Sequence, residues 1–185
     1  SLSRVPSFPY LISSNSSNIV IINNTILGGN DQDLSWPIYI LASYSVIHGN
    51  KIYGGKGFNK IIGVYNYLTK STISNNTVYL GTALDRSSNI ELVYGYINSI
   101  CNNILFSDGS GGNERFGIRE IGLYADPVLV AKNNIYDFGG GGTYGLYNDN
   151  DKSTSFTNIC GNGNFDLNGG SCDDSGDNKL ETPIG

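Results

Sequence analysis

Asp33, Asp85 and Arg86 are the residues whose types and spacing could do chemistry. Asp33, Asn59 and Asp85 follow one another at intervals of 26 residues, and Arg86 is adjacent to the last of them. Acidic oxygens are the ligands that calcium prefers, and an arginine beside them could act as a base. Two carboxylates roughly 5 to 10 Å apart could instead cleave a glycosidic bond. If the protein is an enzyme, these are its candidate catalytic residues.

The alternative for these residues is structural, because aspartate beside glycine and asparagine is ordinary turn chemistry. His48 is the single histidine of the chain and has no acidic partner at a meaningful spacing, so we interpret it as a turn residue. No Cys-x-x-Cys motif and no cysteine–histidine set occurs in the sequence. We therefore expect no metal site and no cofactor.

Tyrosine is abundant, with 13 residues, and five of them follow directly after repeated aliphatic residues. Since alternate residues of a strand face opposite ways, we expect these five side chains to point outward. Exposed rings can stack on sugar rings or anchor a protein partner. They can equally stabilise the strands by packing on one another. The candidate ligand-binding residues are Tyr39, Tyr65, Tyr53, Tyr79 and Tyr136.

An internal repeat in the sequence indicates where the secondary-structure elements that position these residues lie. A first series of aliphatic residues recurs every 26 residues and then after 31, at Ile26, Ile52, Val78, Ile104 and Ile135. A second series consists of Ile38, Val64, Ile90 and Ile121. Each of them lies the same number of residues before one of the later members of the first series. The five extra residues of the long interval fall between Ile104 and Ile121, which is where a repeat structure inserts a loop.

Asparagine recurs two places before each member of the first series. Its side chain tolerates left-handed backbone, and stacked amides can bond to the amides above and below. We therefore expect a structural role rather than ligand binding. The residues concerned are Asn24, Asn50, Asn76, Asn102 and Asn133.

The apolar runs are short, β-branched and interrupted by glycine or asparagine, as in IVII, PIYIL and KIIGV. Such runs are typical of short strands and not of amphipathic helices. A regular repeat of this length without helices predicts a right-handed parallel β-helix, an all-β solenoid of about six coils. A β-sandwich is the structural alternative, but it does not explain the same period in two separate series. Asp33 and Asp85 would then lie two coils apart, about 9.6 Å.

The rhythm NNTI…GG with coils of this length resembles the right-handed parallel β-helix of the pectin-lyase-like superfamily. The segments NNILFSDGSGGNERFGIRE and ADPVLVAKNNIYDF are similar to repetitive β-helix proteins of the spirochaete surface, many of which are lipoproteins. The resemblance implies an extracellular or outer-surface location and a role in adhesion or host contact. It transfers no catalytic residue to this chain.

Composition excludes several function classes. The net charge is −5, the pI is near 4.6, and no basic cluster occurs, so nucleic acid and anionic membranes are not expected partners. The sequence contains no run of about 18 apolar residues, so it predicts no transmembrane segment. The charged fraction of 15% and hydrophobic fraction of 39% do not suit a disordered chain.

The three cysteines leave one without a partner. Cys160 and Cys172 could close a small loop as a disulfide, which would suit an oxidising compartment, whereas three free thiols are the alternative. The sequence indicates no partner for Cys101. We expect the β-helix to span residues 1–170 and a C-terminal tail to span 171–185. Because the chain starts without methionine or signal peptide, we expect a fragment or a processed part of a longer protein.

These observations favour a non-enzymatic, exported surface module with adhesin-like binding of carbohydrate or protein. The outward tyrosines and the loop at 107–115 would contact the partner. One alternative is a polysaccharide lyase or glycoside hydrolase that uses Asp33, Asp85 and Arg86. Another is a structural part of a larger surface protein.

Overall fold

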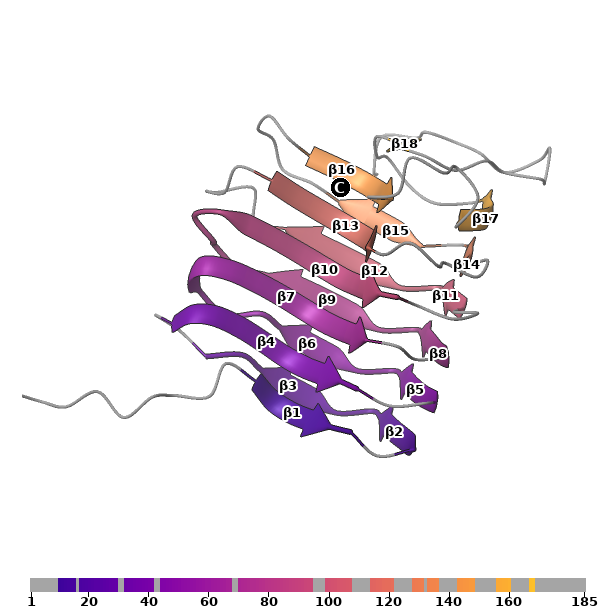
Figure 1. Cartoon of the computed structure of the whole chain (residues 1–185), viewed down its shortest axis with the longest axis horizontal. Coiled ribbons are helices and arrows are strands. Elements are labelled where there is room, and N and C mark those ends of the chain that lie inside the picture. Colours follow the sequence, from indigo (N-terminus) through magenta and orange to yellow (C-terminus); the bar gives the residue numbers. More distant parts are fainter. Residues whose placement is uncertain are drawn as a thin grey trace, which may run out of the picture.

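The computed structural model describes residues 10–15, 17–29, 32–41, 44–67, 70–94, 99–107, 114–121, 128–131, 133–136, 143–148, 156–160 and 167–168. Within these ranges the chain forms strands and no helix. The strands lie in three sheets (Figure 1).

The first sheet contains, in spatial order, β1 (Tyr10–Ser14), β4 (Gln32–Ile40), β7 (Gly57–Tyr67), β10 (Arg86–Val93), β13 (Glu114–Ile121), β16 (Thr143–Asn148) and β18 (Leu167–Asn168). The second contains β2 (Asn18–Ile22), β5 (Tyr44–His48), β8 (Lys70–Ser74), β11 (Ser99–Cys101), β14 (Val128–Ala131) and β17 (Phe156–Cys160). The third contains β3 (Thr25–Leu27), β6 (Lys51–Tyr53), β9 (Thr77–Leu80), β12 (Ile104–Ser107) and β15 (Asn134–Tyr136).

Every strand pairs in parallel with the strand three places before or after it in the chain, except that β18 pairs with β16. Each turn of the chain therefore adds one strand to each sheet, which confirms the expected all-β parallel solenoid (Figure 1). The structure describes about three turns, from β2 to β10, with most of their side chains. This number is lower than the six coils expected from the sequence. The later strands extend the same sheets.

The core consists of stacked aliphatic columns, one from each sheet. Their members come from equivalent places in successive coils and are almost all fully buried, because each coil covers the one before it. The columns are Ile21, Ile47, Ile73 and Ile100; Ile26, Ile52, Val78 and Leu105; and Ile38, Val64, Ile90 and Ile118.

Two members of these columns depart from the strict repeat period. Leu105 pairs with Val78 and is fully buried, whereas Ile104 pairs with Thr77 and is 37% exposed. In the first sheet Ile118 pairs with Ile90, and the expected residue Ile121 pairs with Val93 instead. The coils after Val78 are longer than the earlier ones, and burial of the aliphatic side chain rather than residue number sets the register.

The asparagine column forms a continuous ladder, and its fourth member is Asn103 rather than Asn102. The backbone N and Nδ2 of Asn50 donate to Oδ1 of Asn76 at 2.9 and 3.0 Å, and Asn76 donates to Asn103 in the same way. Asn102 precedes the ladder residue and has left-handed backbone, with φ of 55°. The complete ladder is Asn24, Asn50, Asn76, Asn103 and Asn133.

Candidate functional site

The outward side of the first sheet contains a bend that brings residues three apart into contact. On a flat strand such residues lie on opposite faces. Here Trp36 stacks on Tyr39 within β4 with ring centroids 5.3 Å apart, and Arg119 lies over the Phe116 ring within β13 at 4.9 Å. In β10, between these, Ser88 Oγ donates to Glu91 Oε2 at 3.2 Å. We call the side of β4, β7, β10 and β13 that faces away from the aliphatic core at these residues the bent face. Ser88, Glu91, Phe116 and Arg119 are buried on it.

Gly63 and Asn89 fix the bend from the inner side. A Cβ atom on Gly63 would lie 2.5 Å from Val78 Cγ1 and 2.8 Å from the Asn89 carbonyl oxygen, so this backbone approach requires glycine. One coil later, Asn89 Nδ2 donates to the carbonyls of Val78 and Phe106, each at 3.0 Å. The amide thus ties β10 to two strands of the third sheet.

Three aromatic rings cover the β4–β7 part of the bent face. Tyr39 and Tyr65 stack with centroids 5.0 Å apart, and Trp36 lies 5.3 Å from each of them. The interplanar angles do not exceed 13°, so the rings form one parallel cluster. All three side chains are half-buried, and the cluster therefore offers ring surface to solvent.

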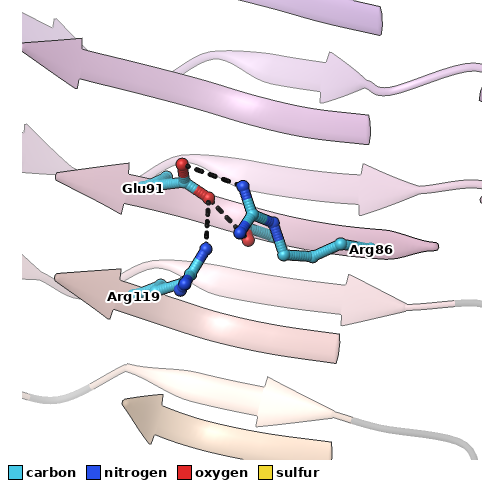
Figure 2. Close-up of polar contacts among 4 residues, drawn as sticks. Arg86, Glu91 and Arg119 are labelled. Carbon is cyan, nitrogen blue, oxygen red and sulfur yellow. Dashed lines mark hydrogen bonds and ion pairs between the residues drawn. The ribbon is translucent and has the colours of Figure 1, made fainter. Parts of the chain in front are cut away.

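An ion group follows the aromatic cluster along the same face. Glu91 has a side chain that is 3% exposed, and its carboxylate lies 3.5 Å from Arg86 and 3.6 Å from Arg119 (Figure 2). Arg86 and Glu91 come from β10, whereas Arg119 comes from the next coil. Glu91 thus bridges two arginines that come from adjacent coils.

The aromatic cluster and the ion group are electrostatically coupled through Tyr65, whose strand partner in the next coil is Glu91. Burial, together with the nearby Glu91 carboxylate, raises the pKa of Tyr65 to about 12, against an opposing effect of Arg86. The phenol therefore stays protonated to a higher pH than that of an ordinary tyrosine.

The predicted catalytic residues do not converge. Asp33 and Asp85 have exposed side chains, and Arg86 turns toward Glu91 instead. No hydrogen bond or ion pair joins the three residues, all of which the structure describes. Nor do the described residues include a group of three or more His, Cys, Asp or Glu side chains that could hold a metal ion.

The other row of tyrosines lies on the third sheet. Tyr53 stacks on Tyr79 and Tyr79 on Phe106, with centroids 5.0 Å apart at each step and planes within 8°. Both faces of the Tyr79 ring are occupied by its neighbours, so this row presents ring edges to solvent. Tyr136 pairs with Phe106 along the backbone, but its side chain lies outside the described residues.

His48 lies beside Ser74, with Nδ1 2.9 Å from Ser74 Oγ. The two residues come from adjacent coils of the second sheet, and Ser74 is buried. Because no acidic group among the described residues bonds to the imidazole, this is a lateral contact of the stack rather than a nucleophile with its base. Cys101 is a free thiol. The predicted Cys160–Cys172 pair lies outside the described side chains, as does the tail at 171–185.

Trp36, Glu91 and Arg119 are site residues that spacing alone did not single out. A signal was present, because Tyr39, Tyr65 and Glu91 recur at the repeat period and share one outward column. Arg119 occupies the next place of that column after a longer interval. Trp36 enters the site through the bend, which residue spacing does not indicate.

The fold defines the class of the chain as a parallel β-solenoid. Comparison with protein-family models, with curated proteins and with solved structures finds no match. Among the described residues no helix is long and apolar enough to cross a membrane.

Proposed function

We propose that the protein is a non-enzymatic, exported surface module that binds carbohydrate through the bent face, in an adhesin-like role. It would belong to the right-handed β-helices of pectin-lyase-like type, among the spirochaete-type surface proteins that its sequence resembles. The observation that supports binding is the half-exposed cluster of Trp36, Tyr39 and Tyr65 beside the ion group of Arg86, Glu91 and Arg119.

Carbohydrate suits this combination of groups. A sugar ring has an apolar face that packs on aromatic rings, and hydroxyl groups that need donors and acceptors. The bent face supplies half-buried rings on β4 and β7 and, one coil further, the guanidinium of Arg86, whose side chain is 15% exposed. An extended saccharide lying along the solenoid axis would contact both groups, because successive coils are about 4.8 Å apart.

The test is binding of the full chain to a panel of neutral and acidic polysaccharides, measured by calorimetry. We expect Trp36→Ala to weaken binding at least about tenfold, the scale of a truncated aromatic anchor. Tyr53→Ala is the matched control, because it removes an outward ring from the third sheet and leaves the bent face intact. Circular dichroism would verify that both variants fold.

Equal binding by both variants would contradict the bent face as the site. Release of reducing ends or unsaturated sugars by the wild-type chain would show an enzyme instead. Absence of binding to every polysaccharide, together with capture of a host-surface protein, would replace carbohydrate by a protein ligand.

A further inference from the structure

Glu91 lies at the centre of the ion group, between the two arginines of the bent face (Figure 2). Its carboxylate lies 3.5 Å from Arg86 and 3.6 Å from Arg119, and Ser88 donates a hydrogen bond to it at 3.2 Å. The residue is buried, so these three partners replace the water that surrounds an exposed carboxylate.

Both arginines turn toward this carboxylate and not toward solvent. The side chain of Arg119 is 10% exposed, and its guanidinium lies over the Phe116 ring at 4.9 Å. Arg86 turns along its own strand to reach Glu91 (Figure 2). A carboxylate or sulfate of a ligand that approached either guanidinium would therefore meet the charge of Glu91, and like charges at close range repel.

The other charges along this column do not favour an anion either. The strand partners of Arg86 in the two adjacent coils are Lys60 and Glu114, which are opposite in sign. The protein as a whole has a charge of −5, which repels a polyanion at long range. The aromatic cluster, in contrast, packs on the apolar face of a sugar ring without any need for charge.

We propose that the bent face takes uncharged saccharides and that Glu91 determines this preference. The inference rests on the proposed carbohydrate binding and names its ligand class. A guanidinium has more N–H donors than one carboxylate occupies, so Arg86 can donate to a sugar hydroxyl while it stays paired with Glu91. Glu91 acts through the arginines and is a positioning residue.

The test compares polysaccharides that differ only in charge, with the full chain and by calorimetry. Each acidic polymer that binds, such as polygalacturonate, is compared with its carboxyl-reduced form. Each neutral polymer that binds is compared with its form oxidised to carboxylates at the primary hydroxyl groups. We expect the neutral form to bind at least about tenfold more tightly at low ionic strength. Added salt should narrow this difference by screening, whereas loss of a hydroxyl contact would not respond to salt.

Glu91→Gln is the test variant, because it removes the carboxylate charge and keeps the size of the side chain. Relative to the wild type, the ratio of acidic to neutral affinity should rise at least about tenfold, since both arginines then lack an anion. Glu114→Gln is the matched control, because it changes the total charge equally at an exposed position of the next coil. Circular dichroism would verify that both variants fold, and the wild-type comparison decides the ligand class if Glu91→Gln does not.

The failures of the two proposals are distinguishable. Absence of binding to every polymer, charged or neutral, would overturn carbohydrate binding and this inference together. Equal or tighter binding of the acidic forms by the wild type would overturn the inference alone. An equal rise of the affinity ratio in Glu91→Gln and Glu114→Gln would assign the preference to total charge and not to Glu91.

Discussion

Two neighbouring residues have different roles in each turn of the ladder. The first has left-handed backbone, with φ of 56° at Asn23, 55° at Asn75 and 55° at Asn102. Glycine takes this place in one coil, where Gly49 has φ of 66°. The second residue is the asparagine whose amide bonds to the adjacent coils. Backbone shape and hydrogen bonding are thus divided between adjacent positions.

Because of this division, substitution by glycine should change the free energy of unfolding little at Asn102 and strongly at Asn103. Asn102→Gly should change the free energy of unfolding by less than about 1 kcal/mol, because glycine adopts left-handed backbone readily. Asn103→Gly should cost on the order of 3 kcal/mol, because two buried donors of Asn76 lose their acceptor. Urea unfolding of the two variants measures the difference, and equal losses would contradict the assigned register.

At the scale of strands, the bent face couples β7 to β10 through Tyr65 and Glu91. The folded chain raises the pKa of Tyr65 to about 12, from an ordinary value of about 10. The folded state therefore keeps a proton that the unfolded state releases in this interval. The contribution of Tyr65 to stability is complete below pH 10 and is lost as the pH rises to about 12.

Tyr65→Phe should accordingly flatten the decline of the unfolding free energy between pH 10 and about 12. Tyr53→Phe is the control, because it removes an outward phenol from the third sheet and leaves the bent face intact. Urea unfolding at a series of pH values provides the comparison. Parallel curves for the wild type and Tyr65→Phe would show that the phenol ionises equally in both states.

For the molecule as a whole, each coil is held by the coils directly above and below it. Stability in such a stack is a sum of neighbour contacts, so a strand with two partners is better protected than an edge strand. The backbone amides of β7 should therefore exchange hydrogen more slowly than those of β2, by at least about tenfold. Hydrogen exchange followed by mass spectrometry tests this gradient at a concentration where the chain is monomeric. Uniform exchange would indicate that all coils open together.

The same architecture explains how much the sequence could reveal. The constant repeat period predicts the parallel solenoid, because stacked columns such as Ile26, Ile52 and Val78 require identical spacing. The strict period misplaces Ile104 and Asn102 by one residue, because coil length varies where a loop can absorb an extra residue. The asparagine doublets at 75–76 and 102–103 carry the correct interval of 27 residues.

The sequence predicts less of the bent face than of the solenoid. Contacts between residues three apart, such as Trp36 with Tyr39, depend on a local departure from strand geometry. Adjacency in the sequence places Arg86 with Asp85, whereas the Arg86 side chain turns along the strand to Glu91. Strand periodicity predicts which side of a sheet a residue faces but not which way a long side chain turns.

The fourth ladder residue is Asn103 rather than Asn102, and this shift indicates how the chain can tolerate insertions during evolution. An inserted residue displaces every later residue by one in the sequence, yet the next amide and the next buried aliphatic resume their columns within a single coil. Insertions and deletions are thus corrected locally instead of accumulating along the axis. Loops can lengthen independently of one another, while the stack that supports them stays the same.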